Sequence, residues 1–145
     1  MFKLRHILIV TLSVFAAIFA AGCGAGGGPT ISAPDAFTKA QAGEVTLIDI
    51  RTPREWRQTG VAEGALTIDM TRKTFVTEIL DAVDGDKDAP IAIICRTGNR
   101  TTYSQKALQG MGFSRVYNVK EGMSGSGAGP GWVRRGLPVD SCQTC

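Results

Sequence analysis

The feature that most constrains the fold is a short run of purely apolar side chains, Ile91–Ile94, which is followed at once by Cys95 and six polar or glycine residues. Such a run is typical of a strand that is buried on both faces of a parallel sheet. Similar apolar runs occupy residues 45–50, 65–68 and 116–119. With helical segments between them, they predict an α/β domain of three layers, in which a central, mainly parallel sheet is flanked by helices.

Helical patterns separate these strands. Short helices are predicted over residues 35–42, which begin just after a proline suited to a first turn, and over residues 53–58, before a glycine. A third helix is expected to take Asp69 or Thr71 as its N-cap, because both side chains can accept a hydrogen bond from a first-turn N–H. A fourth helix is predicted over residues 102–111.

Residues 1–22 are interpreted as a signal peptide that lies outside the fold. Lys3 and Arg5 form a short positive region, and residues 7–21 are an uncharged, largely apolar run of 15 residues. A permanent membrane-spanning helix needs about 20 such residues, so this run is short for an anchor.

A lipid anchor is expected at Cys23. The preceding Ala-Ala-Gly, from Ala20, is similar to the lipobox of bacterial lipoproteins, although the usual first residue is leucine. Lipidation would make Cys23 the first mature residue and hold the protein on a membrane outside the cytoplasm, in the periplasm or cell envelope. Cleavage by the general signal peptidase near the same position is the alternative.

The remaining chain divides into a flexible Gly-rich tether over residues 23–31, one domain over residues 32–140 and a Cys-x-x-Cys tail over residues 141–145. Removing the leader takes two of the 16 Lys and Arg residues and leaves 14 basic against 13 acidic side chains. This near-neutral balance argues against a nucleic-acid partner, because phosphate binding requires a basic face.

The only histidine, His6, lies inside the predicted leader. The mature protein would therefore lack imidazole, which excludes Ser-His-Asp and Cys-His catalysis and any His-ligated metal site. No metal and no cofactor is predicted. The chemistry must use cysteine, carboxylates, hydroxyls, arginine, lysine and the backbone.

Cys95 is the strongest candidate for a reactive residue. It stands where a strand ends and a helix begins, and successive backbone N–H groups in such a turn can converge on one anion. Arg96 and Arg100 add two positive charges, so the loop should stabilise a thiolate or another sulfur anion. The alternative is a buried core cysteine, which fits poorly with the six polar or glycine residues that follow.

These residues resemble the rhodanese family. The stretch Cys-Arg-Thr-Gly-Asn-Arg, from Cys95, is similar to the family's active-site loop, and residues 49–56, Asp-Ile-Arg-Thr-Pro-Arg-Glu-Trp, resemble its first signature. Residues 60–65 match a Gly-His-Ile-x-Gly-Ala motif except that Val and Ala replace His and Ile. Gly-Trp at residues 131–132 and Gly-Leu-Pro-Val at residues 136–139 match the usual end of the domain.

The resemblance spans about residues 33–140 and implies a sulfurtransferase. In that family the cysteine, here Cys95, takes sulfur from a donor such as thiosulfate as a persulfide and passes it to cyanide or a thiol. The implied substrate-binding residues are Arg96, Thr97, Gly98, Asn99 and Arg100. The insert over residues 124–130, near the active-site side, is expected to shape the choice of acceptor. The partners are then a small anionic donor, an acceptor and, through the lipid, a membrane; no oligomeric state is predicted.

Other polar and aromatic residues receive structural interpretations. Asp49 ends a buried strand and needs a partner, which Arg51 or a loop N–H can supply. Trp56 and Trp132 are expected in the core or in loop packing.

Cys142 and Cys145 have two interpretations that remain open. They can form a passive tail disulfide or serve as a redox pair. A zinc site is not expected, because no second Cys-x-x-Cys pair and no mature histidine accompany them.

Two other functions compete with sulfur transfer. Phosphatases and arsenate reductases of this fold need an arginine six places after the cysteine, but Thr101 stands there and Arg100 comes one place early. A non-catalytic binding module of the rhodanese fold is the other alternative, although such modules typically lack the cysteine.

Overall fold

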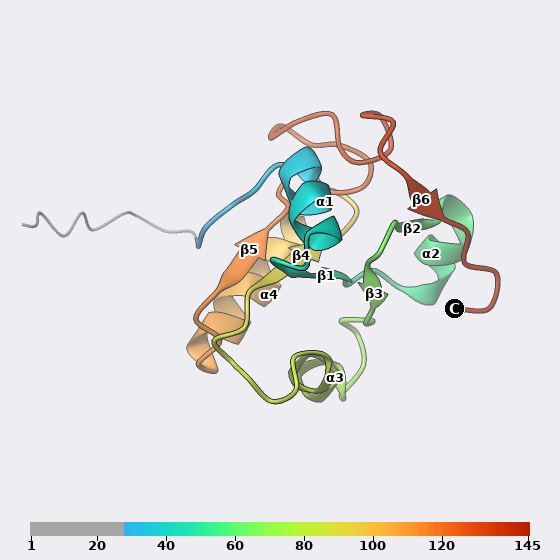
Figure 1. The fold of residues 1–145 in the computed structure, drawn as a ribbon. Coiled ribbons are helices and arrows are strands. Elements are labelled where there is room, and N and C mark those ends of the chain that lie inside the picture. Colours follow the sequence, from blue (N-terminus) through green and yellow to red (C-terminus); the bar gives the residue numbers. More distant parts are fainter. Residues whose placement is uncertain (1–27) are drawn as a thin grey trace, which may run out of the picture.

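The computed structural model describes residues 28–145 and contains a four-stranded parallel sheet at its centre (Figure 1). Its strand order is β3-β1-β4-β5, and all three pairings are parallel. The strands are β1 (Thr46–Asp49), β3 (Leu66–Thr67), β4 (Ile91–Ile94) and β5 (Val116–Asn118). The predicted α/β sheet is confirmed, and β4 coincides with the apolar run.

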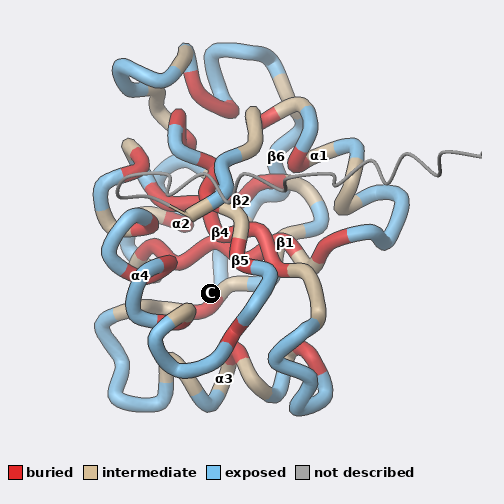
Figure 2. Tube along the Cα trace, turned by 90° about the vertical axis from the view of Figure 1, so that its left-hand side faces the viewer, coloured by how far each residue is buried: buried red, intermediate tan, exposed pale blue. Residues whose placement is uncertain are grey.

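Four helices accompany the sheet: α1 (Ala33–Gln41), α2 (Pro53–Thr59), α3 (Phe75–Ala82) and α4 (Asn99–Gly110). Alternate side chains of β1 and β4 enter separate cores, because successive residues of a strand point to opposite faces. Ile48 and Ile93 join a cluster with residues of α3 and α4. Leu47 and Ile94 join a second cluster with residues of α1 and with Trp132. Three layers result, and Figure 2 shows β1 and β4 within their buried centre.

The predicted boundaries of α1 and α2 agree with the structure to within two residues, and the larger differences are at the starts of α4 and α3. Helix α4 begins at Asn99, three residues early, so the polar loop after Cys95 is only three residues long. The N-cap of α3 is Thr74 and neither Asp69 nor Thr71. Asp69 Oδ1 instead accepts hydrogen bonds from the backbone N–H and the hydroxyl of Thr71, at 2.9 and 2.8 Å. The Asp69 side chain thus closes a local turn and is not available to a helix.

A second, two-stranded sheet was not predicted. β2 (Val61–Ala62) pairs antiparallel with β6 (Val139–Asp140). Strands of two residues carry no readable alternation, so only the folded chain brings these distant segments together. The pairing places the C-terminal segment beside α2, which directly precedes β2 (Figure 1).

Glu121 joins α1 to the Gly-rich segment over residues 122–131. It is buried, and it accepts hydrogen bonds from the Ala33 N–H at 2.7 Å, the Gly131 N–H at 2.9 Å and Arg135 Nε at 2.8 Å. Burial raises the pKa of Glu121, but these hydrogen bonds outweigh it and leave the pKa below its usual value. Nothing local in the sequence indicated this role.

The predicted signal peptide, the anchor at Cys23 and the tether up to residue 27 lie outside the described residues. Between residues 28 and 145, none of the helices combines the length and the apolar character needed to cross a bilayer.

Candidate active site

Cys95 follows the last residue of β4 at the carboxyl end of the sheet, where loops carry the sites of parallel α/β folds. Its side chain is only 1% exposed. The sulfur accepts a hydrogen bond from the Gly98 N–H at 3.2 Å and lies 3.7 Å from Thr101 Oγ1. Cys95 is the free cysteine of the described chain. It therefore lies beneath its own loop and is not in open solvent.

The start of α4 carries unpaired hydrogen-bond donors next to the loop that holds this sulfur. Gly98 is the N-cap, so Asn99, Arg100 and Thr101 are the first three helical residues and have no intrahelical acceptor for their N–H groups. Within residues 28–145, no other acceptor is recorded for them either. Unpaired donors and the positive end of the helix dipole together favour a negative charge at this place.

The loop is braced from behind by the segment that follows β5. The Met123 N–H donates to the Cys95 carbonyl at 2.8 Å, and the Ser124 N–H donates to the Arg96 carbonyl at 2.9 Å. Gly98 has a positive φ of 82°, and a Cβ there would overlap the Lys120 carbonyl oxygen. Only glycine satisfies both the backbone angle and this close approach.

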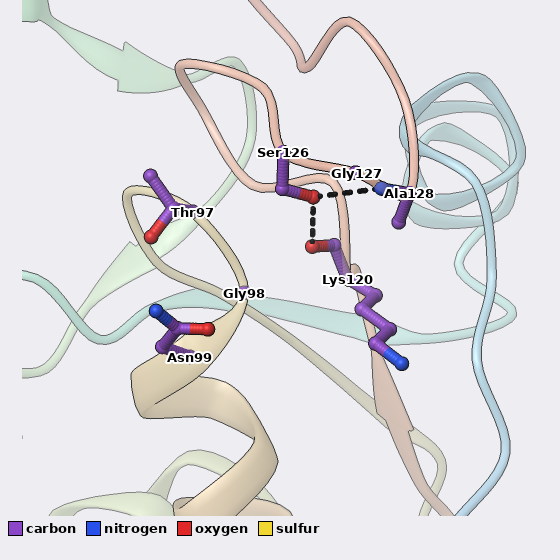
Figure 3. A pocket seen from close by; sticks show the side chains of 7 residues that line it. All are labelled: Thr97, Gly98, Asn99, Lys120, Ser126, Gly127 and Ala128. Carbon is purple, nitrogen blue, oxygen red and sulfur yellow. Dashed lines mark hydrogen bonds between the residues drawn. The ribbon is translucent and has the colours of Figure 1, made fainter.

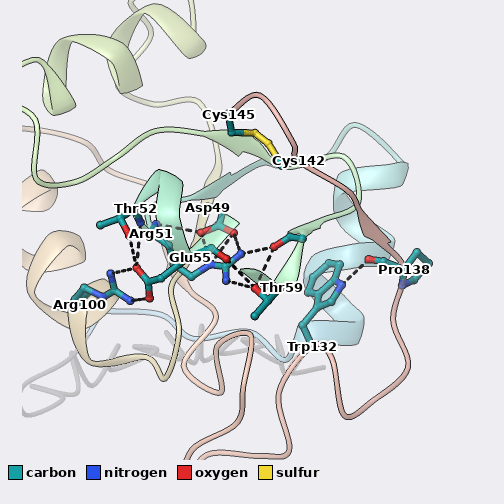
Figure 4. A network of polar contacts seen from close by, with 11 residues as sticks. Asp49, Arg51, Thr52, Glu55, Thr59, Arg100, Trp132, Pro138, Cys142 and Cys145 are labelled. Atoms are coloured by element: carbon teal, nitrogen blue, oxygen red, sulfur yellow. Dashed lines mark hydrogen bonds and ion pairs between the residues drawn. A yellow bond between two sulfur atoms is a disulfide. The ribbon is translucent and has the colours of Figure 1, made fainter. Parts of the chain in front are cut away.

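The two loop arginines have different surroundings. Arg100 Nη1 donates to Glu55 Oε2 at 2.8 Å, and its Nη2 donates to the other carboxylate oxygen, so the pair is bidentate (Figure 4). Arg96 is exposed and makes no ion pair within the described residues. Both were expected to bind substrate, but the charge of Arg100 is already balanced by a carboxylate. Sequence reasoning missed Glu55, although it lies in the first family-like signature.

Glu55 also caps α2. Its Oε2 accepts hydrogen bonds from the N–H and the hydroxyl of Thr52, at 3.1 and 3.0 Å, which completes a capping box. The hydrogen bonds from Arg100 are the main cause that lowers the pKa of Glu55 to about 2, and those from Thr52 add to the effect. One carboxylate thus holds the beginnings of α2 and α4 together beside Cys95.

Asp49 and Arg51 form a buried pair at the end of β1. Arg51 Nε lies 2.9 Å from each carboxylate oxygen of Asp49, and the Arg51 backbone N–H donates to Oδ1 at 3.0 Å. Both partners that the sequence suggested for Asp49 are therefore used. The guanidinium also donates to Thr59 Oγ1 and to the Gly60 carbonyl, each at 2.6 Å. The pair joins β1 to the end of α2, and its hydrogen bonds commit Nε and Nη2 of Arg51 to the fold.

Two hollows lie beside the loop. The smaller, of about 90 Å³, is lined by Arg51, Glu55, Gln58, Thr59, Arg96 and Ser124. The larger, of about 340 Å³, lies between residues 97–99 and residues 126–128 of the insert, with Lys120 at its edge (Figure 3). Among residues 28–145, Lys120 is the one charged residue that lines it. The insert therefore does lie on the active-site side.

Cys142 and Cys145 are joined as a disulfide (Figure 4). The Cys145 carbonyl accepts a hydrogen bond from Arg57 Nη1 of α2 at 2.7 Å. In the part of the chain that the structure describes, no three His, Cys, Asp or Glu side chains are grouped as metal ligands. Trp56 and Trp132 are both buried, in agreement with the packing role expected for them.

The depressed pKa of Glu55 predicts a loss of stability in acid. The stabilisation is complete above the usual carboxyl pKa of about 4.5 and is lost as the pH falls toward 2. By pH 3 the loss is about 2 kcal/mol of unfolding free energy. Urea unfolding at pH 7 and pH 3 should show that Glu55→Gln removes this part of the pH dependence and lowers stability at pH 7.

Glu44→Gln is the matched control, because Glu44 pairs with Lys39 at an exposed site and exposed pairs contribute little. Glu121 also has a lowered pKa, so the informative quantity is the difference between wild type and variant. An undiminished acid loss in Glu55→Gln would contradict the assignment.

Comparison with known proteins places this geometry in a family. The family model described as the rhodanese-like domain matches residues 33–127, which is more than half of the chain. A sulfurtransferase of Allochromatium vinosum is 32% identical over 96 residues, which cover 66% of this chain and 78% of that protein. A thiosulfate sulfurtransferase, GlpE, of Actinobacillus pleuropneumoniae is 29% identical over 96 residues, with the same coverage of each chain.

A solved structure agrees with these relatives. The solution structure of the polysulfide-sulfur transferase homodimer of Wolinella succinogenes has a TM-score of 0.59 and 27% identity, and the similarity covers 80% of each chain. The sheet order, the cysteine at the end of β4 and these matches lead to one conclusion: the chain belongs to the rhodanese family, which includes sulfurtransferases.

Proposed function

We propose that this protein is a sulfurtransferase that moves sulfane sulfur from thiosulfate, or a similar anionic donor, to cyanide or a thiol through a persulfide on Cys95. The observation that carries the proposal is the position of the Cys95 sulfur. It accepts the Gly98 N–H and lies at the N-terminus of α4, where three further N–H groups are unpaired within the described residues. The sulfurtransferase names of two relatives support the same chemistry.

The first half-reaction loads sulfur onto the protein. The Cys95 thiolate attacks the outer sulfur of thiosulfate, the sulfur–sulfur bond of the donor breaks, and sulfite leaves with the electron pair. The persulfide anion that forms extends from Cys95 toward the unpaired N–H groups of Asn99, Arg100 and Thr101. These donors are fixed by the helix before the reaction, so they need no reorganisation when the charge arrives.

The second half-reaction removes the outer sulfur from the Cys95 persulfide. Cyanide or a thiolate attacks the outer sulfur, and Cys95 leaves as a thiolate stabilised by the same donors. Because the Cys95 side chain is almost fully covered, reactants that present a single slim atom are favoured. Three reactants meet this condition: thiosulfate through its terminal sulfur, cyanide, and a primary thiol.

Arg96 is the cation that attracts the anionic donor. It is exposed, and it lines the small hollow beside the loop. Arg100 instead positions the loop, because Glu55 holds both of its terminal nitrogens. The same pair argues against a phosphatase or arsenate reductase, since a clamped guanidinium cannot grip a tetrahedral oxyanion through both nitrogens. A non-catalytic module would have no use for a sulfur held among unpaired donors.

Cys95→Ser should abolish thiosulfate:cyanide sulfur transfer, with a loss of at least about a thousandfold, because a hydroxyl cannot form the persulfide. Intact-protein mass after incubation with thiosulfate should show one added sulfur atom on wild type and none on the variant. The control is Cys142→Ser/Cys145→Ser, which should retain transfer to cyanide. Activity that survives in Cys95→Ser and is lost in the control would overturn the assignment.

The larger hollow is the proposed binding place for an organic acceptor thiol that carries a carboxylate. Its volume of about 340 Å³ exceeds what cyanide needs and is within the range of small-ligand pockets. Lys120 supplies a positive charge there, and Thr97, Asn99 and Ser126 supply polar groups. Gly98, in its wall, donates directly to the Cys95 sulfur.

Lys120→Gln should therefore raise the KM for a carboxylate-bearing thiol such as glutathione by about tenfold, through loss of one charge-assisted contact. The kinetics with cyanide should stay unchanged. Lys106→Gln, at an exposed lysine of α4, is the matched control. An equal effect of Lys120→Gln on both acceptors would refute an acceptor pocket here.

For the leader we propose that Cys23 carries diacylglycerol and holds the protein on a membrane outside the cytoplasm. The support is the sequence alone: two positive charges, a short apolar run and Ala-Ala-Gly before Cys23. Wild type should partition with membranes, and its N-terminal peptide should begin with a lipidated Cys23. Cys23→Ser should be uncleaved or released from the membrane. A mature N-terminus at another, unmodified residue would exclude the anchor.

A further inference from the structure

The disulfide between Cys142 and Cys145 has no role in the transfer described above. A disulfide stabilises a fold least when it closes a short loop. This one joins residues three apart in the last five of the chain and crosslinks no two elements of the fold. Its redox chemistry is therefore a better explanation for the pair than stability.

The fold fastens the tail to α2. β6 ends at Asp140 and pairs with β2, which immediately follows α2. The contact is close, because a Cβ at Gly60 would lie 2.8 Å from the Asp140 carbonyl oxygen. Beyond β6, the only hydrogen bond recorded for the tail in the described chain is the exposed one from Arg57 to the Cys145 carbonyl. A single exposed hydrogen bond opens easily, so the last five residues can leave α2 while β6 stays paired.

The same helix lies against the cysteine loop. Glu55 of α2 holds Arg100, and Glu55, Gln58 and Thr59 line the small hollow together with Arg96. Figure 4 draws the disulfide in one view with the Glu55–Arg100 pair. The tail and the loop thus contact one helix of seven residues, and the width of a helix with its side chains is about 10–12 Å.

The reach of the tail assigns roles to its two cysteines. Cys142 stands two residues beyond Asp140, so it reaches about 7 Å from the paired strand, which is less than the width of a helix. Cys145 stands five residues beyond Asp140 and reaches about 17 Å, which is more than the width of a helix. From a tail that is still anchored at β6, Cys145 therefore has enough reach to pass the width of the helix, whereas Cys142 does not.

We propose, on the basis of the sulfurtransferase function above, that Cys145 and Cys142 reduce the Cys95 persulfide and release its outer sulfur as sulfide. The Cys145 thiolate attacks that outer sulfur, the bond to Cys95 Sγ breaks, and Cys95 leaves as a thiolate. The Cys142 thiolate then attacks Cys145 Sγ, the bond to the outer sulfur breaks, and hydrosulfide leaves.

The electrons balance within the chain. Formation of the disulfide removes two electrons from the two tail thiols. The same two electrons reduce the sulfane sulfur to sulfide. The reaction ends in the Cys142–Cys145 pairing that the structure contains. A dithiol reductant, of the chemical class of thioredoxin-like proteins, must reduce the disulfide before the next turnover. The attack is intramolecular, so its rate benefits from the high effective concentration that a short tether provides.

The test is a single turnover without external thiol. The full chain is reduced with a dithiol, freed of it under argon and mixed with one equivalent of thiosulfate. Sulfide and the masses of the Cys95 and tail peptides are then followed over time. Wild type should release sulfide at a rate independent of protein concentration and at least tenfold faster than Cys142→Ser/Cys145→Ser, which should keep its sulfur on Cys95.

The single variants separate the two steps. Cys142→Ser should trap the sulfur on Cys145, because the resolving thiol is missing, whereas Cys145→Ser should leave it on Cys95. Arg57→Gln should accelerate sulfide release by freeing the tail, and Arg54→Gln, at a neighbouring exposed arginine of α2, should not.

The outcomes distinguish this proposal from the one on which it rests. A double variant that acquires no sulfur on Cys95 would refute the sulfurtransferase function itself. A persulfide that forms on Cys95 but decays equally fast in wild type and double variant would overturn the role of the tail and leave the transfer function intact. Release that depends on protein concentration would also overturn the intramolecular step.

Discussion

Strand β4 is hydrogen-bonded on both edges, to β1 and to β5, and it is buried on both faces. This double constraint determines where the chain can bear a reactive group. A strand held on four sides cannot shift its register, so its last residue delivers Cys95 to one position at the edge of the sheet. The helix that follows begins directly after the loop, and the N–H of its N-cap, Gly98, donates to the sulfur. Rigidity in the sheet is therefore the condition for the fixed position of the cysteine at the start of this helix.

Around this site the fold consistently pairs buried or half-buried charges. Glu55 with Arg100 and Glu121 with Arg135 link separate segments of the chain near the cysteine loop, and the local pair of Asp49 with Arg51 is joined to the end of α2 through Thr59 and Gly60. An unpaired charge in such places would be costly, which is why each carboxylate also accepts backbone hydrogen bonds. Of the two loop arginines, Arg100 is therefore paired with a carboxylate, whereas Arg96 is exposed and makes no ion pair within the described residues.

Helix α2 contacts three other parts of the fold through its side chains. It is only seven residues long, yet it supplies Glu55 to the loop, Thr59 to Arg51 and Arg57 to the tail. The buried Trp56 anchors it in the fold. The cysteine loop and the Cys-x-x-Cys tail both contact this helix, so α2 is the element that connects the two cysteine regions of the fold.

Several features followed from the sequence by itself, because they depend on residues that are neighbours in the chain. The apolar run of β4, the cysteine at its end, the glycine-containing loop and the pairing of Asp49 with Arg51 two residues away are local, and local patterns can be read directly. The tertiary structure alone decided that Glu55 neutralises Arg100, 45 residues away, that Glu121 receives the N–H of Ala33, and that β2 pairs with β6. Their partners are determined by the strand order and by how the helices cross the sheet. Which loop arginine is paired with a carboxylate, and which helix contacts the C-terminal cysteines, is thus a property of long-range packing. No spacing along the chain encodes a contact between segments that only the folded sheet brings together.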